Sequence, residues 1–244
     1  MPAEVQDAAA KVWTGPDQPQ EVFTYLANWI RAGSRRIPYS TVTAVDSIDA
    51  IGPLLGADGH AVQLEKDEIV LNGWAAEELQ AQPGDRIEIT YFDPVTTHGR
   101  VEEKTAAFRL HSIVPLYVDQ HDDQQRPTLA NDRHLTPELA GVTDQASMDD
   151  WDPPFPFDAS RVRAQDESYW DNYRATPKAF ISQQAGEVLW GSRFGDITSL
   201  RVPKLKTESA EAAKLRLRRS LQQELSRSDT FAFRNIRNEL LTAA

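Results

Sequence analysis

The chain has 244 residues, enough for one large domain or two ordinary ones, and its 40% hydrophobic content predicts a folded core. The 37 acidic and 26 basic side chains give a net charge of −11, so general binding to nucleic acid is not expected. Cysteine is absent, which excludes disulfides, thiolate nucleophiles and cysteine-based zinc sites. No window approaches the roughly 18–20 apolar residues of a membrane span, and the first residues lack the pattern of a signal peptide.

The first strong pattern predicts a core-facing helix over residues 22–30, because Val22, Leu26, Trp29 and Ile30 recur at helical spacing before Gly33. Residues 37–45 are rich in β-branched side chains and predict a strand. The next unit, 68–117, predicts strand, helix, strand and strand, with a Pro-Gly-Asp turn at 83–85.

The middle of the chain changes in character. Residues 119–152 carry nine acidic and two basic side chains and predict a long acidic loop. Beyond it, short helices are expected near 166–173 and 187–190, and strands over 178–183 and 196–202. The last confident element is an amphipathic helix over 208–226, and a β-like run follows at 230–234.

Two groups of residues have the composition of chemical sites. His121, Asp122, Asp123 and His134 are metal-ligand types, but their spacing matches no ligand motif, so we predict a solvated loop and no metal or other cofactor. Acidic and aromatic residues between Trp151 and Asp171, Asp152 and Asp166 among them, resemble the content of a sugar site. Asp166 is also placed to stabilise a helix N-terminus, and we expect that structural use.

Nucleotide-binding loops and the nucleophile elbow of hydrolases are both missing from the sequence, so we do not predict an enzyme. The outer face of the helix at 208–226 is basic: seven Lys or Arg and three Glu lie between Pro203 and Arg227. Such a face is usually simply solvated, and its functional alternatives are contact with an anionic membrane surface or with a partner helix. Arg216, Arg218 and Arg219 are the candidate residues for contact with anionic lipid head groups. Trp151, Asp152, Phe155 and Phe157 are candidate contacts to a partner or cargo.

Several longer strings carry a family resemblance that spans residues 21–242. They are EVFTYLANWI at 21–30, IPYSTVTA at 37–44, the block 68–92, LTPE at 135–138, WDPPFPFD at 151–158, YWDNYRATPKAF at 169–180 and LWGSRFG at 189–195. Together they resemble the large extracytoplasmic domain of FtsX/MacB-like ABC transporter permeases, in a divergent branch.

The resemblance implies an α+β fold with two parts. A porter-like subdomain of βαβ units would be built from both chain ends, 1–66 and 160–244. A smaller, sabre-like α+β subdomain, 67–159, would be inserted into it and would include the acidic loop 119–152. The chain would then be a piece of a longer permease, lying between two membrane helices with its ends close together.

The function implied by the resemblance is non-catalytic. The domain would lie on the extracytoplasmic (periplasmic) side of the membrane and couple ATP-driven motion of the membrane helices to a lipid, lipoprotein or efflux cargo, or to a partner protein. The cognate ATPase would be a separate subunit or domain, and the full-length protein would be dimeric. Two alternatives stay open at this stage: a stand-alone hydrolase of cell-envelope glycans, and an adaptor that binds a protein through residues 119–152.

Overall fold

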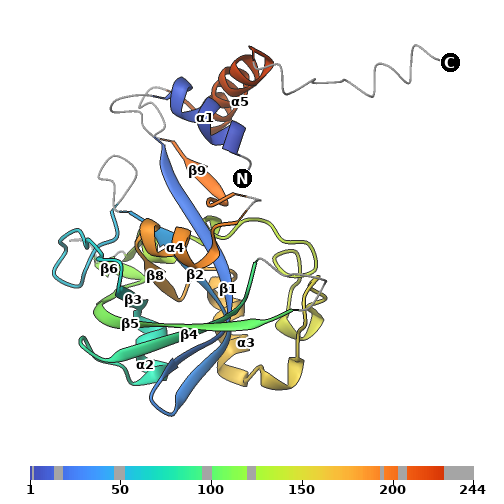
Figure 1. Cartoon of the computed structure of the whole chain (residues 1–244). Helices are drawn as coiled ribbons and strands as arrows, with labels where there is room; N and C mark the ends of the chain where they lie inside the picture. The colour runs from blue at the N-terminus through green and yellow to red at the C-terminus, as the bar shows by residue number, and fades with distance from the viewer. Residues whose placement is uncertain are drawn as a thin grey trace. The chain divides into compact units, whose positions relative to one another are not determined.

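The computed structural model describes residues 1, 3–13, 19–46, 53–94, 101–119, 125–192, 195–202 and 208–227. The chain forms two compact units, of which the larger is Gln20–Arg201 and the smaller joins Met1–Pro19 to Val202–Ala244 (Figure 1). The larger unit is a mixed α+β structure. Its longer strands and helices are β1 (Gln20–Ala32), β2 (Arg35–Val45), β3 (Glu68–Asn72), α2 (Gly73–Leu79), β4 (Arg86–Phe92), β5 (Glu103–Val114), α3 (Ala164–Tyr173), β8 (Ala179–Ile181), α4 (Gln183–Trp190) and β9 (Ser199–Arg201).

Six of these strands close into a barrel. The order of pairing is β2-β8-β3-β5-β4-β1, and β1 pairs back to β2 as a long antiparallel hairpin. The pairs β2–β8 and β3–β5 are parallel and the others in the ring are antiparallel. The short strand β9 extends the sheet by pairing with the start of β1.

The strand β1 corrects the prediction of a helix over residues 22–30. Val22, Phe23, Ala27 and Ile30 are all buried, and the strand keeps a regular register with β2 from Val22 to Ala32. A bulge between Ala27 and Trp29 shifts its register with β4. Residues on both faces of the strand are buried or half-buried. The sequence therefore lacks the alternation of apolar and polar side chains that marks a half-exposed strand, and its apolar residues happen to recur at helical spacing.

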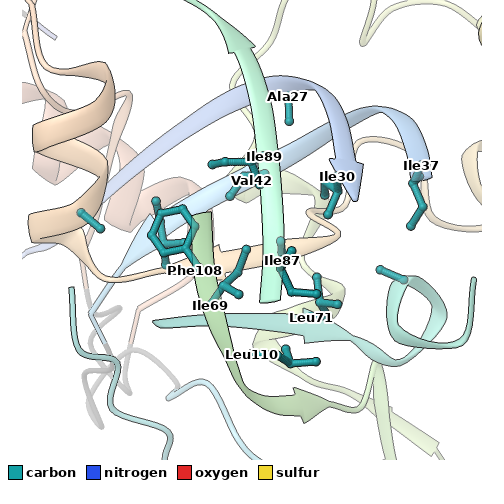
Figure 2. Packing of buried hydrophobic residues seen from close by; sticks show 14 of the residues in the cluster. Ala27, Ile30, Ile37, Val42, Ile69, Leu71, Ile87, Ile89, Phe108 and Leu110 are labelled. Atoms are coloured by element: carbon teal, nitrogen blue, oxygen red, sulfur yellow. The ribbon is translucent and has the colours of Figure 1, made fainter. Parts of the chain in front are cut away.

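The barrel interior is the main hydrophobic core. Figure 2 shows side chains from five strands gathered there, with Ile30 on β1, Val42 on β2, Leu71 on β3, Ile87 on β4 and Phe108 on β5. All of them are buried. Trp190, the last residue of α4, packs against Phe23 and stacks on Tyr25 with ring centroids 5.4 Å apart. Closure of the sheet therefore buries one continuous apolar interior.

Several local predictions are confirmed. The strands at 68–72 and 86–92 are β3 and β4, and the helix between them is α2. Asn72 caps that helix by accepting from the backbone N–H of Ala75 at 2.8 Å. Gly84, in the turn before β4, has φ +97°, a conformation that glycine adopts readily. The helix predicted at 166–173 is α3, which begins two residues earlier.

The acidic segment folds against the barrel. The small sheet β6 (Tyr117–Asp119) and β7 (Gln125–Pro127) leads into three 3₁₀ turns, Leu129–Asn131, Arg133–Leu135 and Met148–Asp150, and a fourth, Ala159–Arg161, precedes α3. The side-chain hydroxyl of Thr24 on β1 donates to the carbonyl of Leu135 at 2.7 Å. Leu135 is fully buried. From Leu129 onward the predicted loop is thus a packed layer, whereas residues 120–124 lie outside the described part of the chain.

The compact units have boundaries other than those expected from the resemblance. Strands β3, β4 and β5 of the expected insertion, 67–159, lie in the same closed sheet as β1, β2 and β8. Backbone hydrogen bonds between strands close this ring, for example between β2 and β8 and between β1 and β4. They join the two expected parts into one compact unit. The sabre-like and porter-like assignments stay predictions.

The smaller unit pairs the two helices nearest the chain ends, α1 (Ala3–Val12) and α5 (Ala210–Arg227). Lys11 of α1 forms an ion pair with Glu224 of α5, with 3.8 Å between the charged atoms. The helix predicted at 208–226 is confirmed as α5, whereas the β-like run at 230–234 lies outside the described residues. Among the helices that the structure describes, none is both long and apolar enough to cross a bilayer.

Candidate functional site

A cavity of about 140 Å³ lies in the larger unit, against β1 and β2. One part of its lining comes from the outer faces of these strands and includes Leu26, Tyr39 and Thr41. The rest comes from residues 136–178, the segment that carries the 3₁₀ turn at Met148, the helix α3 and the approach to β8. The cavity is therefore formed by parts of the chain about 100 residues apart in sequence.

Apolar and aromatic side chains dominate its wall. Tyr39, Val142, Met148, Trp151 and Trp170 are buried in one hydrophobic cluster, and all five line the cavity. The rings of Trp151 and Trp170 meet edge to face, with centroids 5.0 Å apart. Aromatic and aliphatic walls with few polar groups are typical of sites for small ligands.

The predicted contact string is part of this wall or of its support. Trp151 is 8% exposed and lines the cavity, whereas Asp152 is exposed to solvent. Phe157 is half-buried and packs between Trp151, at 5.5 Å, and Tyr39, at 4.7 Å. Phe155 is half-buried near Phe92. The structure thus brings three of the four residues into one aromatic layer, and their contact with a partner stays a prediction.

The loop that carries Trp151 is fixed by a close backbone contact. Gly141 has φ +79°, and its carbonyl accepts from the backbone N–H of Asp152 at 2.8 Å. A Cβ atom at Gly141 would overlap the carbonyl oxygen of Asp152. Only glycine fits this position without a shift of the loop.

Lys178 is the residue that sequence reasoning missed. It directly precedes β8, it is 4% exposed and it lines the cavity. Its ammonium lies over the rings of Trp74 and Tyr169, 4.7 and 4.6 Å from their centroids. Burial lowers the pKa of this amine to about 8, although Asp166 and Glu78 act in the opposite direction. A lysine beside a hydrophobic strand gives no signal in the sequence, because its burial depends on which segment covers it.

Asp166, named above as a candidate sugar-site carboxylate, is fully buried and caps α3. It accepts from the backbone N–H of Arg163 at 3.0 Å and from the guanidinium of the same residue at 2.7 Å through each carboxylate oxygen. Arg163 also approaches Glu78. The carboxylate is thus occupied by a structural ion pair.

Tyr39 and Arg174, which both line the cavity, have φ values of +37° and +54°. Among the described residues other than glycine, positive φ occurs at one further position, Gln80, where it ends α2. The hydroxyl of Tyr39 accepts from the backbone N–H of Asp158 at 2.8 Å, and Arg174 donates to the carbonyl of Ala146 at 2.6 Å. These bonds hold both residues in conformations that cost energy, as is common around binding sites.

The predicted basic face lies on α5. The guanidinium of Arg216 is half-buried and pairs with Glu208 at 2.7 Å, whereas Arg218 and Arg219 are exposed. Contact of this face with lipid stays a prediction. Of the predicted metal-ligand types, His121, Asp122 and Asp123 lie outside the described residues, and His134 is exposed. Within the described ranges, no group of three or more His, Asp or Glu side chains is arranged to hold a metal ion.

Comparisons with known proteins give one solved structure to report. The crystal structure of the periplasmic region of MacB from Actinobacillus actinomycetemcomitans is 9% identical to this chain, with a TM-score of 0.43. The overlap covers 92% of this chain and 73% of that one. No family model matches the chain, and no curated protein matches it. A likeness at this level does not by itself assign a function.

Proposed function

We propose that this chain is the extracytoplasmic domain of an ABC transporter permease and that it works without catalysing a reaction. The observation that carries the proposal is the pairing of α1 with α5, because it brings both ends of the described chain into one unit. A domain that is inserted between two membrane helices needs this arrangement. The family resemblance across residues 21–242 is the second support.

In this proposal the domain transmits motion. Two membrane helices, joined to the chain beyond α1 and α5, move when a cognate ATPase on the cytoplasmic side hydrolyses ATP. The barrel is a closed ring with a continuous core, so it moves as a stiff body. Cargo or a partner protein is handled by the surface of the larger unit, and Arg218 and Arg219 contact anionic head groups.

The geometry around Asp166 supports the non-catalytic part of the proposal. A glycosidase needs one carboxyl group that can donate a proton and a second that faces the reacting sugar. Asp166 is fully buried and bound by the guanidinium of Arg163, and Asp152 is exposed on the surface. Turnover of a cell-envelope glycan by the purified chain, abolished by Asp152→Asn, would establish the hydrolase alternative instead.

The first test is the reading frame that encodes the chain. We expect it to continue on both sides into an apolar helix of about 20 residues. A reporter fused within the domain should then be found outside the cytoplasm. A frame that ends on either side without such a helix refutes the proposal.

The second test addresses transmission of motion. These 244 residues contain no cysteine, so Lys11→Cys and Glu224→Cys can be introduced together into a full-length permease whose flanking segments have been made cysteine-free. In the proposed transmission, α1 and α5 move apart when the membrane helices move, so a short bis-maleimide bridge that holds α1 against α5 should abolish transport while ATP hydrolysis continues. Each single variant, treated with the same reagent, should transport normally. Full transport by the bridged protein would contradict a mechanism in which the two helices move apart.

A further inference from the structure

The cavity beside β1 and β2 has a wall whose hydroxyl groups are already used within the protein. Serine and threonine side chains line it, and each of their hydroxyls donates to a backbone carbonyl oxygen. These side chains are Thr24, Ser40, Thr41, Thr136, Thr143 and Thr176. A hydroxyl has one proton to donate, so none of them can also donate to a ligand.

The aromatic side chains of the wall add no hydrogen-bond donor. The hydroxyl of Tyr169 donates to the carbonyl of Thr176 at 3.1 Å. The indole nitrogens of Trp151 and Trp170 are enclosed by the protein, each with less than 1 Å² exposed. The rings of these residues therefore contribute apolar surface to the site and not polar recognition.

The charges of the wall are balanced inside the protein or lie in water. Both carboxylate oxygens of Asp166 accept from the guanidinium of Arg163, and Glu138 is exposed. Lys178 lies over two aromatic rings, and although burial lowers the pKa of its amine, Asp166 acts against this by stabilising the positive charge. Arg174 donates to a backbone carbonyl at 2.6 Å. The wall therefore requires no charged group from a ligand.

The size of the cavity sets the size of the ligand. Leu26, Leu139, Val142 and Met148 supply aliphatic surface. The volume of about 140 Å³ is close to that of an engineered apolar cavity, about 150 Å³, that accommodates benzene. A single six-membered ring, or a chain of about six carbon atoms, therefore fits this space.

Two features distinguish this space from a packing defect. Protein interiors contain few spaces larger than a water molecule, yet Tyr39 and Arg174 keep costly positive φ values in the wall of this one. A surface depression shares Thr136, Thr143 and Arg174 with the cavity, so the two adjoin. A ligand thus has a route from the surface into the apolar space.

We propose that this cavity is a binding site for a small neutral apolar molecule, whose body is a single ring or a chain of about six carbon atoms. The ligand packs against Leu26, Leu139, Val142 and Met148, and burial of apolar surface holds it in place of hydrogen bonds. The site does not depend on the proposed role in a permease, because binding is a property of the larger unit alone.

The test uses the whole 244-residue chain, labelled with ¹³C at the methionine methyl groups, and benzene as the probe. The chain contains two methionines: Met148 is buried and lines the cavity, whereas Met1 belongs to the smaller unit. The ring current of bound benzene should shift the methyl resonance of Met148 in a saturable way, with a Kd of about 1 mM or lower. The resonance of Met1 should stay in place.

Pyridine is the matched polar probe, because it has the shape of benzene with one ring nitrogen that accepts a hydrogen bond. It is uncharged at pH 7. The hydroxyl donors of the wall are committed to the chain itself, so the pyridine nitrogen loses its bond to water without a replacement. Pyridine should therefore bind about tenfold or more weakly than benzene.

Filling the cavity should abolish binding. Val142→Phe adds a ring to the wall and should weaken benzene binding about tenfold or more. The matched control is the same substitution at Val188, which is 79% exposed and does not line the cavity; Val188→Phe should bind benzene as the wild type does. Leu139→Phe, at a half-buried position of the same wall, tests the site if a melting curve shows that Val142→Phe is unfolded.

Three results would overturn the proposal. The first is that benzene at about 10 mM leaves the Met148 methyl resonance in place. The second is that pyridine binds as tightly as benzene, which would mean that the wall recognises a polar group. The third is that a folded Val142→Phe or Leu139→Phe variant binds benzene as tightly as Val188→Phe. The first two decide the matter even if neither filling variant folds. None of these results bears on whether membrane helices flank the chain, so the two proposals fail separately.

Discussion

At the scale of single residues, Lys178 makes stability depend on pH. Burial lowers its pKa from 10.5 in an ordinary lysine to about 8, and Asp166, Glu78 and Arg163 are the charged groups that act on it. Between these two values the unfolded chain binds a proton that the folded chain does not, so the free energy of unfolding rises with pH across this window. Below about pH 8 both states are protonated and the full cost of the buried charge is present.

Lys178→Met removes this cost. We expect the variant to be more stable than the wild type at pH 7, by up to about 3 kcal/mol, with the difference shrinking as the pH rises towards 10. Urea unfolding at pH 7, 8, 9 and 10 measures the difference, and Lys66→Met at an exposed position is the control. If the curves of wild type and Lys178→Met stay parallel, the amine of Lys178 is not desolvated as the structure has it.

Gly141 determines how the loop of Trp151 lies against the barrel. Gly141→Ala places a Cβ against the carbonyl of Asp152 at φ +79°, so we expect a loss of about 2–4 kcal/mol of unfolding free energy. Gly33→Ala is the matched control, because Gly33 also has positive φ, +54°, but nothing lies within 4 Å of an added Cβ. Gly33→Ala should lower the free energy of unfolding by about 1 kcal/mol. If urea unfolding shows equal losses of unfolding free energy for Gly141→Ala and Gly33→Ala, the loop at Asp152 can move aside for the added Cβ without cost.

At the scale of elements, α3 depends on its first turn. Asp166→Asn keeps the shape of the side chain but removes the charge that accepts three donors of Arg163, so we expect a loss of about 1.5–3 kcal/mol. Asp158→Asn, at the exposed cap of the 3₁₀ turn Ala159–Arg161, should lower the free energy of unfolding by less than Asp166→Asn does. Chemical denaturation compares the two, and an Asp166→Asn variant as stable as Asp158→Asn would argue against a structural role for the pair.

Elements with a local cause could be predicted from the sequence, and elements whose pattern depends on the tertiary structure could not. The helix α2 is determined by its cap at Asn72 and its own apolar stripe, and the start of β4 by the turn at Gly84. Each of these signals lies within a few residues of the element it determines, so β3, α2 and β4 were predictable. The strand β1 was not, because its two faces are covered by different parts of the chain and no alternation remains. For the cavity, the string from Trp151 to Phe157 indicated an aromatic cluster, but which strands it covers depends on pairing between segments far apart in sequence.

At the scale of the whole molecule, the barrel strands, the cavity and the three described hydrophobic clusters all lie in the larger unit, Gln20–Arg201. The ring of strands closes within this range, since β8 fills the place between β2 and β3. Helices α1 and α5 add no strand to it. Folding of the larger unit should therefore not require the smaller one.

We expect a fragment of residues 20–201 to fold by itself, with a single cooperative thermal transition. A fragment of residues 20–160 is the matched control. It lacks α3 and β8, so the edges of β2 and β3 are left unpaired and we expect no cooperative transition. If residues 20–201 fail to fold while the full chain melts cooperatively, the pair of α1 and α5 is part of the folding unit, and motion of the chain ends would then act on the barrel directly.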